Sequence, residues 1–346
     1  MPHRITKAIR ILIFLAIGAL FLVIAFRGIS AEGLVQGLRS ASYKWIMISL
    51  LFASLAFVSR TYRWILLIEP MGYRPGVKNT FYAIMTGYLA NFVLPRLGEI
   101  TRCGTLNRTD RIPVDSLLGT VIIERISDLL VLFLLATAVI FIKIELFGNF
   151  LYIYIFMPLY QMMMSWLDFP WFFHIMIVSA ILIILIFYRI ITIWLRKYSV
   201  WRRIERVAQR ILEGMRSVAG MKKTLQFLLH TIFIWLMYFL MTWAVFMSLP
   251  STAELGAADV LFILVIGGLG MAVPVQGGIG AYHWIVSAGL GIYGISKEEG
   301  LVFATLSHES QAILMIILGT FSMLMVFIKM KKAKQPVYKL SNSPGK

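Results

Sequence analysis

Three ionisable residues, Glu124, Arg125 and Asp128, stand close together inside a long apolar segment of this sequence. A charge at the centre of a membrane helix costs about 2.5–3.5 kcal/mol, so these side chains cannot face lipid unpaired. Glu124 and Asp128 share one helix face, and Arg125 precedes Asp128 by three residues and can pair with it. We interpret Arg125 as the ligand of a phosphate group, oriented by the two carboxylates. A salt bridge that only joins helices is the alternative.

A second polar pair, His308 and Glu309, lies inside the last apolar segment, and His283 precedes it. Histidine titrates near neutral pH, so a proton relay suits this pair. His283, His308 and Glu309 have the donor types of a metal site, but their spacing does not require one, and we predict no metal. We also find no P-loop, HExxH or GxSxG motif and predict no cofactor.

Breaks that contain proline and glycine precede both charged segments. The first reads Asn91-Phe-Val-Leu-Pro95-Arg-Leu-Gly98-Glu99, and the second reads Met271-Ala-Val-Pro274-Val-Gln-Gly277-Gly278-Ile-Gly280. The glycines of the second break permit positive φ, and backbone N–H groups in such a turn can cradle a phosphate. Close helix packing is the other use of glycine in membranes. The prolines free backbone groups for which Asn91, Glu99 and Gln276 can supply partners.

Composition places these residues in a membrane protein. Of the 346 residues, 60% are hydrophobic and 14% are charged, against roughly 45–50% and 25% in a soluble domain. This balance excludes a soluble globular enzyme and a disordered chain. The net charge of +17 fits cytoplasmic loops and anionic headgroups rather than nucleic acid. The single cysteine, Cys103, excludes a disulfide framework within the chain.

Apolar segments of about 20 residues predict the membrane spans. The uninterrupted ones are 9–26, 45–66, 117–142, 171–195, 224–249 and 300–328. Proline and glycine break the segments 79–95 and 258–294, and Pro158 interrupts the segment 144–168. The predicted fold class is therefore all-α: a polytopic transmembrane helical bundle with two broken, re-entrant regions. It forms one domain over residues 1–328, followed by a basic cytoplasmic tail, 329–346.

Clusters of Lys and Arg predict the orientation, because they favour the cytoplasmic side. They occur at the N-terminus, in 60–78, in 189–223 and from Lys329, so both termini are expected in the cytoplasm, with the bundle in the cell membrane. The arginines between 96 and 111 stay on that side only if 79–95 enters the membrane and returns. The segment 144–168 then lies at the outer interface. The segment 196–223 predicts a basic amphipathic helix on an anionic leaflet or an ordinary loop helix.

The two broken regions also suggest an inverted repeat, with units at about 79–142 and 258–328. Each unit has proline, then glycine three residues later, then a short polar turn and a long apolar helix. The separation from Ile112 to Arg125 and that from Ile295 to His308 are both 13 residues. Broken helices at matching positions of two halves are typical of transporters with a site near the midplane. Two unrelated proline-kinked helices are the alternative.

The chain resembles the lysylphosphatidylglycerol synthase transmembrane-region family, or flippase-like domain family. The residues that carry the resemblance are the stretch Asn91–Glu99, Arg102, the pair Glu124-Arg125 with Asp128, and Pro274 with the following glycines. The resemblance covers about residues 9–328. It implies a membrane domain that moves aminoacylated phosphatidylglycerol between leaflets, which a separate soluble domain synthesises in bifunctional members. We recognise no such soluble domain and expect no synthase activity. This chain departs from the family at two places: the family often has Pro-Gly-Arg where this chain has Pro95-Arg96-Leu97, and Arg where it has His308. The resemblance therefore does not identify the transported lipid.

We therefore predict a lipid translocase or flippase-like transporter for a phospholipid or a polyprenyl-phosphate-linked lipid, and favour a transporter over an enzyme. The candidate substrate-binding residues are Asn91, Glu99, Arg102, Glu124, Arg125, Asp128, Gly277, Gly278, Gly280, His308 and Glu309. The expected partners are membrane lipids with an anionic headgroup or lipid phosphate, with a second copy of the chain or an envelope-biosynthesis enzyme as further candidates. The alternatives are a lipid-modifying transferase and a non-transporting scaffold for envelope biosynthesis.

Overall fold

The computed structural model describes residues 30–167, 221–273 and 275–334, with isolated positions between 19 and 27 and between 175 and 189. Within these residues the chain forms helices and turns and no strand, which confirms the predicted all-α class. Most of the spans predicted at 9–26 and 171–195, and nearly all of the basic segment 196–223, lie outside the described residues.

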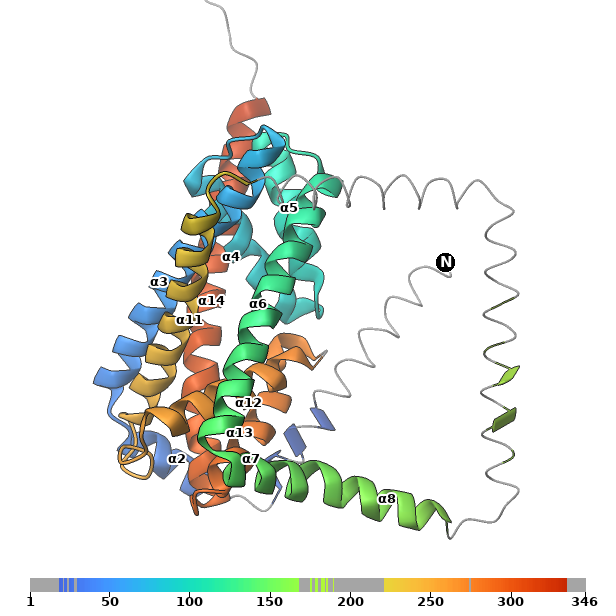
Figure 1. The fold of residues 1–346 in the computed structure, drawn as a ribbon. Helices are drawn as coiled ribbons and strands as arrows, with labels where there is room; N and C mark the ends of the chain where they lie inside the picture. The colour runs from blue at the N-terminus through green and yellow to red at the C-terminus, as the bar shows by residue number, and fades with distance from the viewer. Residues whose placement is uncertain are drawn as a thin grey trace, which may run out of the picture.

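Long apolar helices form the body of the molecule (Figure 1). They are α3 (Tyr43–Ile68, extended by the short helix η1, Glu69–Met71), α6 (Val114–Ile142), α11 (Thr224–Phe246) and α14 (Lys297–Lys334). Each is long and apolar enough to cross a bilayer. Their bounds lie within a few residues of the predicted spans, except that α14 continues past 328 to Lys334. Its last residues are mainly Lys, Met and Ala, which favour helix.

The first broken region forms a helical hairpin of α4 (Val77–Val93) and α5 (Leu97–Asp110). The chain reverses between them, where Pro95 has no N–H to donate and Arg96 adopts a φ of 63°. The side-chain oxygen of Asn91 accepts a hydrogen bond of 2.7 Å from the N–H of Gly98. Asn91 thus satisfies a backbone group at the turn, as its position in the sequence predicted.

Gly87 and Gly98 let α4 and α5 approach closely. A Cβ at Gly87 would lie 2.8 Å from the carbonyl oxygen of Gly98, and one at Gly98 would lie 2.7 Å from the side-chain oxygen of Asn91. We therefore expect Gly98→Ala to lower the free energy of unfolding by about 1–3 kcal/mol, measured by denaturant titration of the purified protein. Gly104→Ala is the control, since a Cβ there meets nothing within 4 Å in the described structure. Equal stability of the two variants would contradict this packing.

The second broken region forms a hairpin of α12 (Ala257–Ala272) and α13 (Ala281–Gly291), with the short helix η3 (Gln276–Gly278) in its turn. Gly277, Gly278 and Gly280 have φ values of 59°, 82° and 83°. This confirms the positive φ predicted for these glycines, which residues with a Cβ rarely adopt. The four hairpin helices have 17, 14, 16 and 11 residues, fewer than the roughly 20 that a full crossing needs.

The two hairpins occupy opposite halves of the bundle (Figure 1). Helices α4 and α5 lie in the upper half of this view and α12 and α13 in the lower half, while α6 and α14 extend through both. The turns meet near the middle, where a Cβ at Gly277 would lie 2.7 Å from the ring of Phe92. Each half has its own apolar core; the upper one includes Trp64, Met85, Leu106 and Leu117, and the lower one includes Phe246, Phe262, Val286 and Phe303.

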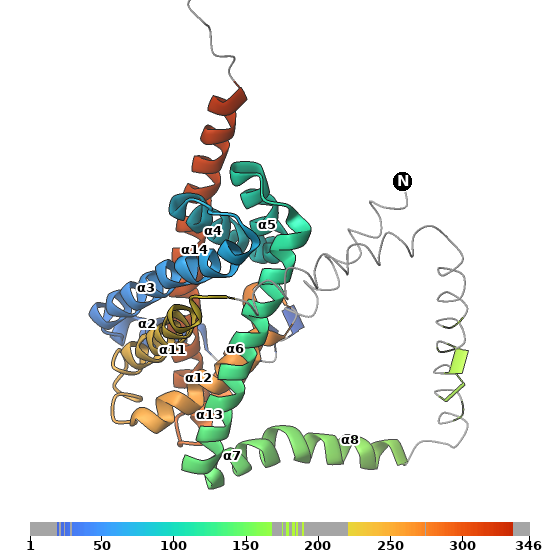
Figure 2. The same ribbon diagram turned by 45° about the horizontal axis from the view of Figure 1, so that its top comes forward.

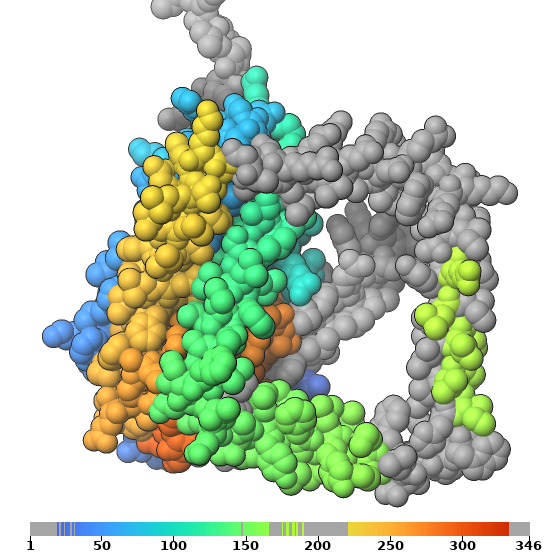
Figure 3. Space-filling model, in the orientation of Figure 1, coloured from blue at the N-terminus to red at the C-terminus, as the bar shows by residue number. Residues whose placement is uncertain are grey.

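Two further elements lie beside this body. Helix α2 (Ala31–Ser40) was not predicted, because it is short and amphipathic; the Ser30 side chain caps it by accepting from the N–H of Gly33. Helix α7 (Ile144–Leu151), a π-helical turn η2 (Tyr152–Phe156) and α8 (Met157–Leu167) follow α6. Helix α8 projects away from the bundle in both ribbon views (Figures 1 and 2). In the space-filling view, α6 and α11 cover the near face above it (Figure 3).

Candidate functional site

A cavity of about 420 Å³ lies where the two hairpin turns meet. Its charged lining residues are Arg60 from α3, Arg96 and Glu99 from the first hairpin, and Arg125 from α6. Much of the remaining wall is apolar and comes from several helices: Phe57, Phe92, Trp235, Met241, Ile263, Met271 and Met315. The cavity therefore combines a cationic wall with a large apolar surface.

The predicted site residues divide into those that line this cavity and those that lie behind its wall. The lining residues are Asn91, Glu99, Arg125, Gly277, Gly278 and His308. The residues Arg102, Glu124, Asp128, Gly280 and Glu309 are not part of the lining. Arg102, Glu124 and Asp128 instead form the ion-pair network that holds the lining residue Arg60.

Glu124 is the centre of this network. The Nη2 atom of Arg60 lies 2.6 Å from Oε1 of Glu124, and Nη1 of Arg102 lies 2.9 Å from Oε2. Asp128 accepts two hydrogen bonds from Arg63, of 2.7 and 3.1 Å, and one of 3.1 Å from Arg60. The side chains of Glu124 and Arg63 are 1% and 0% exposed. Glu124 and Asp128 share a helix face, as their spacing predicted.

Arg60 and Arg63 are the functional candidates that the sequence analysis missed. The predicted span 45–66 and the basic segment 60–78 both include Arg60 and Arg63; in the structure α3 continues to Ile68 and buries both side chains. Their spacing of three residues places both on one face of α3, towards α6. The available signal was the presence of two arginines in one predicted span and two carboxylates in another. Charges of either sign need a partner of the opposite sign inside a membrane.

Arg125 has a different partner from the one predicted. Asp128 is occupied by Arg60 and Arg63, and Nε of Arg125 lies 3.0 Å from Oε1 of Glu99. The predicted pairing of Arg125 with Asp128 is therefore wrong, because both oxygens of the Asp128 carboxylate bind the arginines of α3. The Arg125 and Glu99 side chains are 43% and 35% exposed. Arg125 consequently presents an accessible guanidinium to the cavity.

The charges behind the wall do not cancel. Three buried arginines, at 60, 63 and 102, face the two carboxylates of Glu124 and Asp128, which leaves one positive charge. The Arg125–Glu99 pair is neutral in sum, and Arg96 adds a further positive charge to the lining. A low-dielectric cavity with this excess favours an anionic ligand.

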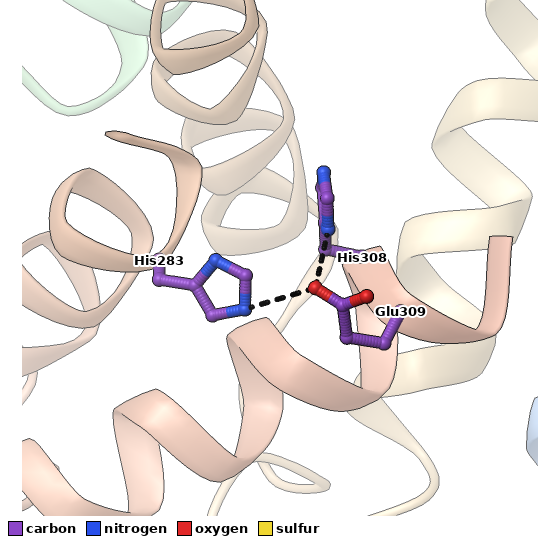
Figure 4. Close-up of side chains that lie close together, drawn as sticks. All are labelled: His283, His308 and Glu309. Carbon is purple, nitrogen blue, oxygen red and sulfur yellow. Dashed lines mark hydrogen bonds and ion pairs between the residues drawn. The ribbon is translucent and has the colours of Figure 1, made fainter. Parts of the chain in front are cut away.

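The second polar group lies on α13 and α14 (Figure 4). The ring nitrogens of His308 lie 2.7 Å from the carbonyl oxygen of Gly277 and 2.9 Å from Oε1 of Glu309. Nε2 of His283 lies 3.6 Å from the same carboxylate oxygen. His308 thus contacts the turn of the second hairpin, as Arg125 contacts Glu99 just after the turn of the first.

These features define a multi-pass α-helical membrane protein with an amphipathic, positively charged cavity between two helical hairpins. The family described as the lysylphosphatidylglycerol synthase TM region matches residues 9–319, and the chain belongs to this family. The match confirms the family predicted by resemblance. A UPF0104 membrane protein of Methanocaldococcus jannaschii is 27% identical over 131 residues, which are 37% of this chain and 38% of the relative. The similarity to that relative therefore spans less than half of its length.

Proposed function

We propose that this protein binds lipids with an anionic headgroup or a lipid phosphate and moves them between the leaflets of the cell membrane. The observation that carries the proposal is the cavity at the junction of the two hairpin turns. Arg60, Arg96 and Arg125 supply its cationic part, and aromatic and methionine side chains supply its apolar part. A phospholipid or polyprenyl phosphate has the same two chemistries, a phosphate and hydrocarbon chains.

In this proposal Arg125 binds the phosphate. Its guanidinium matches a phosphate in geometry and charge. Its close partner is the partly exposed carboxylate of Glu99, which an incoming phosphate can replace, while Glu124 lies 3.9 Å away. Glu124 and Asp128 fix Arg60 at the cavity wall before the ligand arrives. Gly277 and Gly278 bring the backbone of the second turn to the cavity without a side chain in between.

We further infer that the two hairpins are the re-entrant halves of an inverted repeat. The helices of each hairpin are too short to cross the bilayer. The two hairpins enter the bundle from opposite ends (Figure 1). Arg125 and His308, matched by counting from Ile112 and Ile295, contact corresponding places in the two hairpins. Movement of one half against the other would expose the cavity to each leaflet in turn. The proposed orientation has both termini in the cytoplasm.

Leaflet exchange in liposomes tests this proposal. The full-length protein is reconstituted with headgroup-labelled phosphatidylglycerol, phosphatidic acid, polyprenyl phosphate or phosphatidylcholine, and protein-free liposomes give the background rate. We expect faster exchange of at least one anionic lipid than of phosphatidylcholine, with every lipid mass unchanged. A change in lipid mass would instead support the transferase alternative. Background exchange of all lipids by a folded protein would contradict translocation and favour the scaffold alternative.

A further inference from the structure

Three metal-type donors converge beside the second hairpin turn, at His283, His308 and Glu309 (Figure 4). One donor atom from each residue lies within 4.8 Å of the other two. His283 belongs to α13 and the other two to α14, so the group joins two helices. Both histidines are buried, while the Glu309 side chain is 42% exposed, which gives an ion a way in.

The two contacts of His308 bring a ring nitrogen and a carboxylate together as two acceptors unless a cation lies between them. The carbonyl of Gly277 can only accept, so Nε2 of His308, 2.7 Å away, must carry a proton. In a neutral imidazole the other nitrogen, Nδ1, then carries a lone pair and can only accept a hydrogen bond. It lies 2.9 Å from the Glu309 carboxylate, which is also an acceptor. A positive group, either a proton or a metal ion, must separate them.

The position of His283 distinguishes these two cations. A proton on Nδ1 of His308 would satisfy the bond to Glu309 alone. Nε2 of His283 lies 3.6 Å from the same oxygen, beyond hydrogen-bond distance. A metal ion gives all three donors a role. In a tetrahedral site with bonds of about 2.0–2.1 Å, ligand atoms are about 3.3 Å apart, between the two observed separations of 2.9 and 3.6 Å.

We propose that Nε2 of His283, Nδ1 of His308 and Oε1 of Glu309 bind a divalent transition-metal ion of the Zn²⁺ type. Two imidazoles and one carboxylate are a known donor set for zinc, with the fourth position left to water or another ligand. The N–H of His308 already donates to a carbonyl, which is the usual support of a metal-binding histidine and fixes the required tautomer. The ion would join α13 to α14 and hold the Gly277 turn at the cavity wall.

Zinc binding by the full-length protein, purified without a histidine tag, tests the site. After chelator treatment and Zn²⁺ titration, we expect one ion retained per chain on gel filtration, measured by elemental mass spectrometry, and a Zn²⁺-dependent rise in the thermal midpoint. Co²⁺ should give the visible bands of a tetrahedral complex. His283→Gln and Glu309→Gln should each lower the affinity at least about tenfold, since even outer partners of a metal contribute that much.

His230→Gln is the matched control, because His230 lies on α11 and bonds to Ser59 instead. It should leave the stoichiometry and affinity unchanged. Glu309→Gln keeps the test valid if the histidine variants do not fold, since Glu309 is partly exposed. Wild-type protein that retains no zinc, or that retains as much as His283→Gln and Glu309→Gln, would overturn the proposal. The readout is metal content, so this result is independent of lipid exchange.

Discussion

Replacement of Glu124 with glutamine should lower the free energy of unfolding by about 3–5 kcal/mol, the usual effect of removing one partner of a buried ion pair. Glu124 accepts from Arg60 and Arg102 and lies 3.4 Å from Arg63. Without its charge, three buried arginines share the single carboxylate of Asp128. A neutral amide also turns donors toward guanidinium groups that can only donate. The measurement is denaturant unfolding of the purified protein in one detergent.

Glu99→Gln is the matched control for this experiment. It removes a carboxylate from a pair whose side chains are 35% and 43% exposed, and exposed pairs contribute only about 0–1 kcal/mol. Arg102→Met introduced with Glu124→Gln should recover part of the loss, because it removes one of the unpaired charges. Equal stability of wild type and Glu124→Gln would show that the network does not hold α3, α5 and α6 together.

Arg125→Ala should slow the exchange of the transported anionic lipid about 10- to 100-fold, while stability changes little. A hydrogen bond to a charged group contributes about 1.5–3 kcal/mol, and each 1.4 kcal/mol corresponds to about tenfold. The stability expectation follows from exposure, since Arg125 is 43% exposed, pairs closely with Glu99 at 3.0 Å and reaches Glu124 only at 3.9 Å. The measurement is the initial rate of leaflet exchange at equal protein density, with unfolding curves of the same preparations.

Two further variants show whether Arg125 acts through its charge or its shape. Arg125→Lys keeps the charge but loses the planar fork, so its rate should fall between those of wild type and Arg125→Ala. Glu99→Gln frees Arg125 from its carboxylate, and should raise the affinity for the anionic lipid. An Arg125→Ala protein that exchanges lipid at the wild-type rate would remove Arg125 from the transport path.

Hydropathy predicted the long helices well, because a run of about 20 apolar residues is long enough to span a bilayer as a helix and is uncommon in soluble proteins. The helices α3, α6 and α11 therefore begin and end close to the predicted positions. The glycine conformations of the second turn were also predictable, since three glycines within four residues indicate positive φ. The helix α2 was missed because a short amphipathic helix has no such strong signal.

Side-chain partners were much less predictable than helices. Arg125 and Asp128 have the spacing of a pair on one helix, but the partners of Asp128 come from α3, more than 60 residues earlier. Local spacing cannot rank a neighbour on the same helix against a charge on another one. The same limit applies to His283, which is 25 residues from His308 in the sequence. Its approach to Glu309 depends on how α13 packs against α14.

The length of α14 exceeds what a single bilayer crossing needs. Its 38 residues rise about 57 Å at 1.5 Å per residue, whereas a bilayer with its headgroups is about 40–45 Å thick. Even at an average tilt of about 20°, this helix exceeds that thickness by about two turns. The C-terminal turns of α14 contain Lys329 and Lys331, and Lys329 bonds to Asn79 at the start of α4. We therefore expect α14 to extend past the bilayer, with these lysines as a basic group at its C-terminal end.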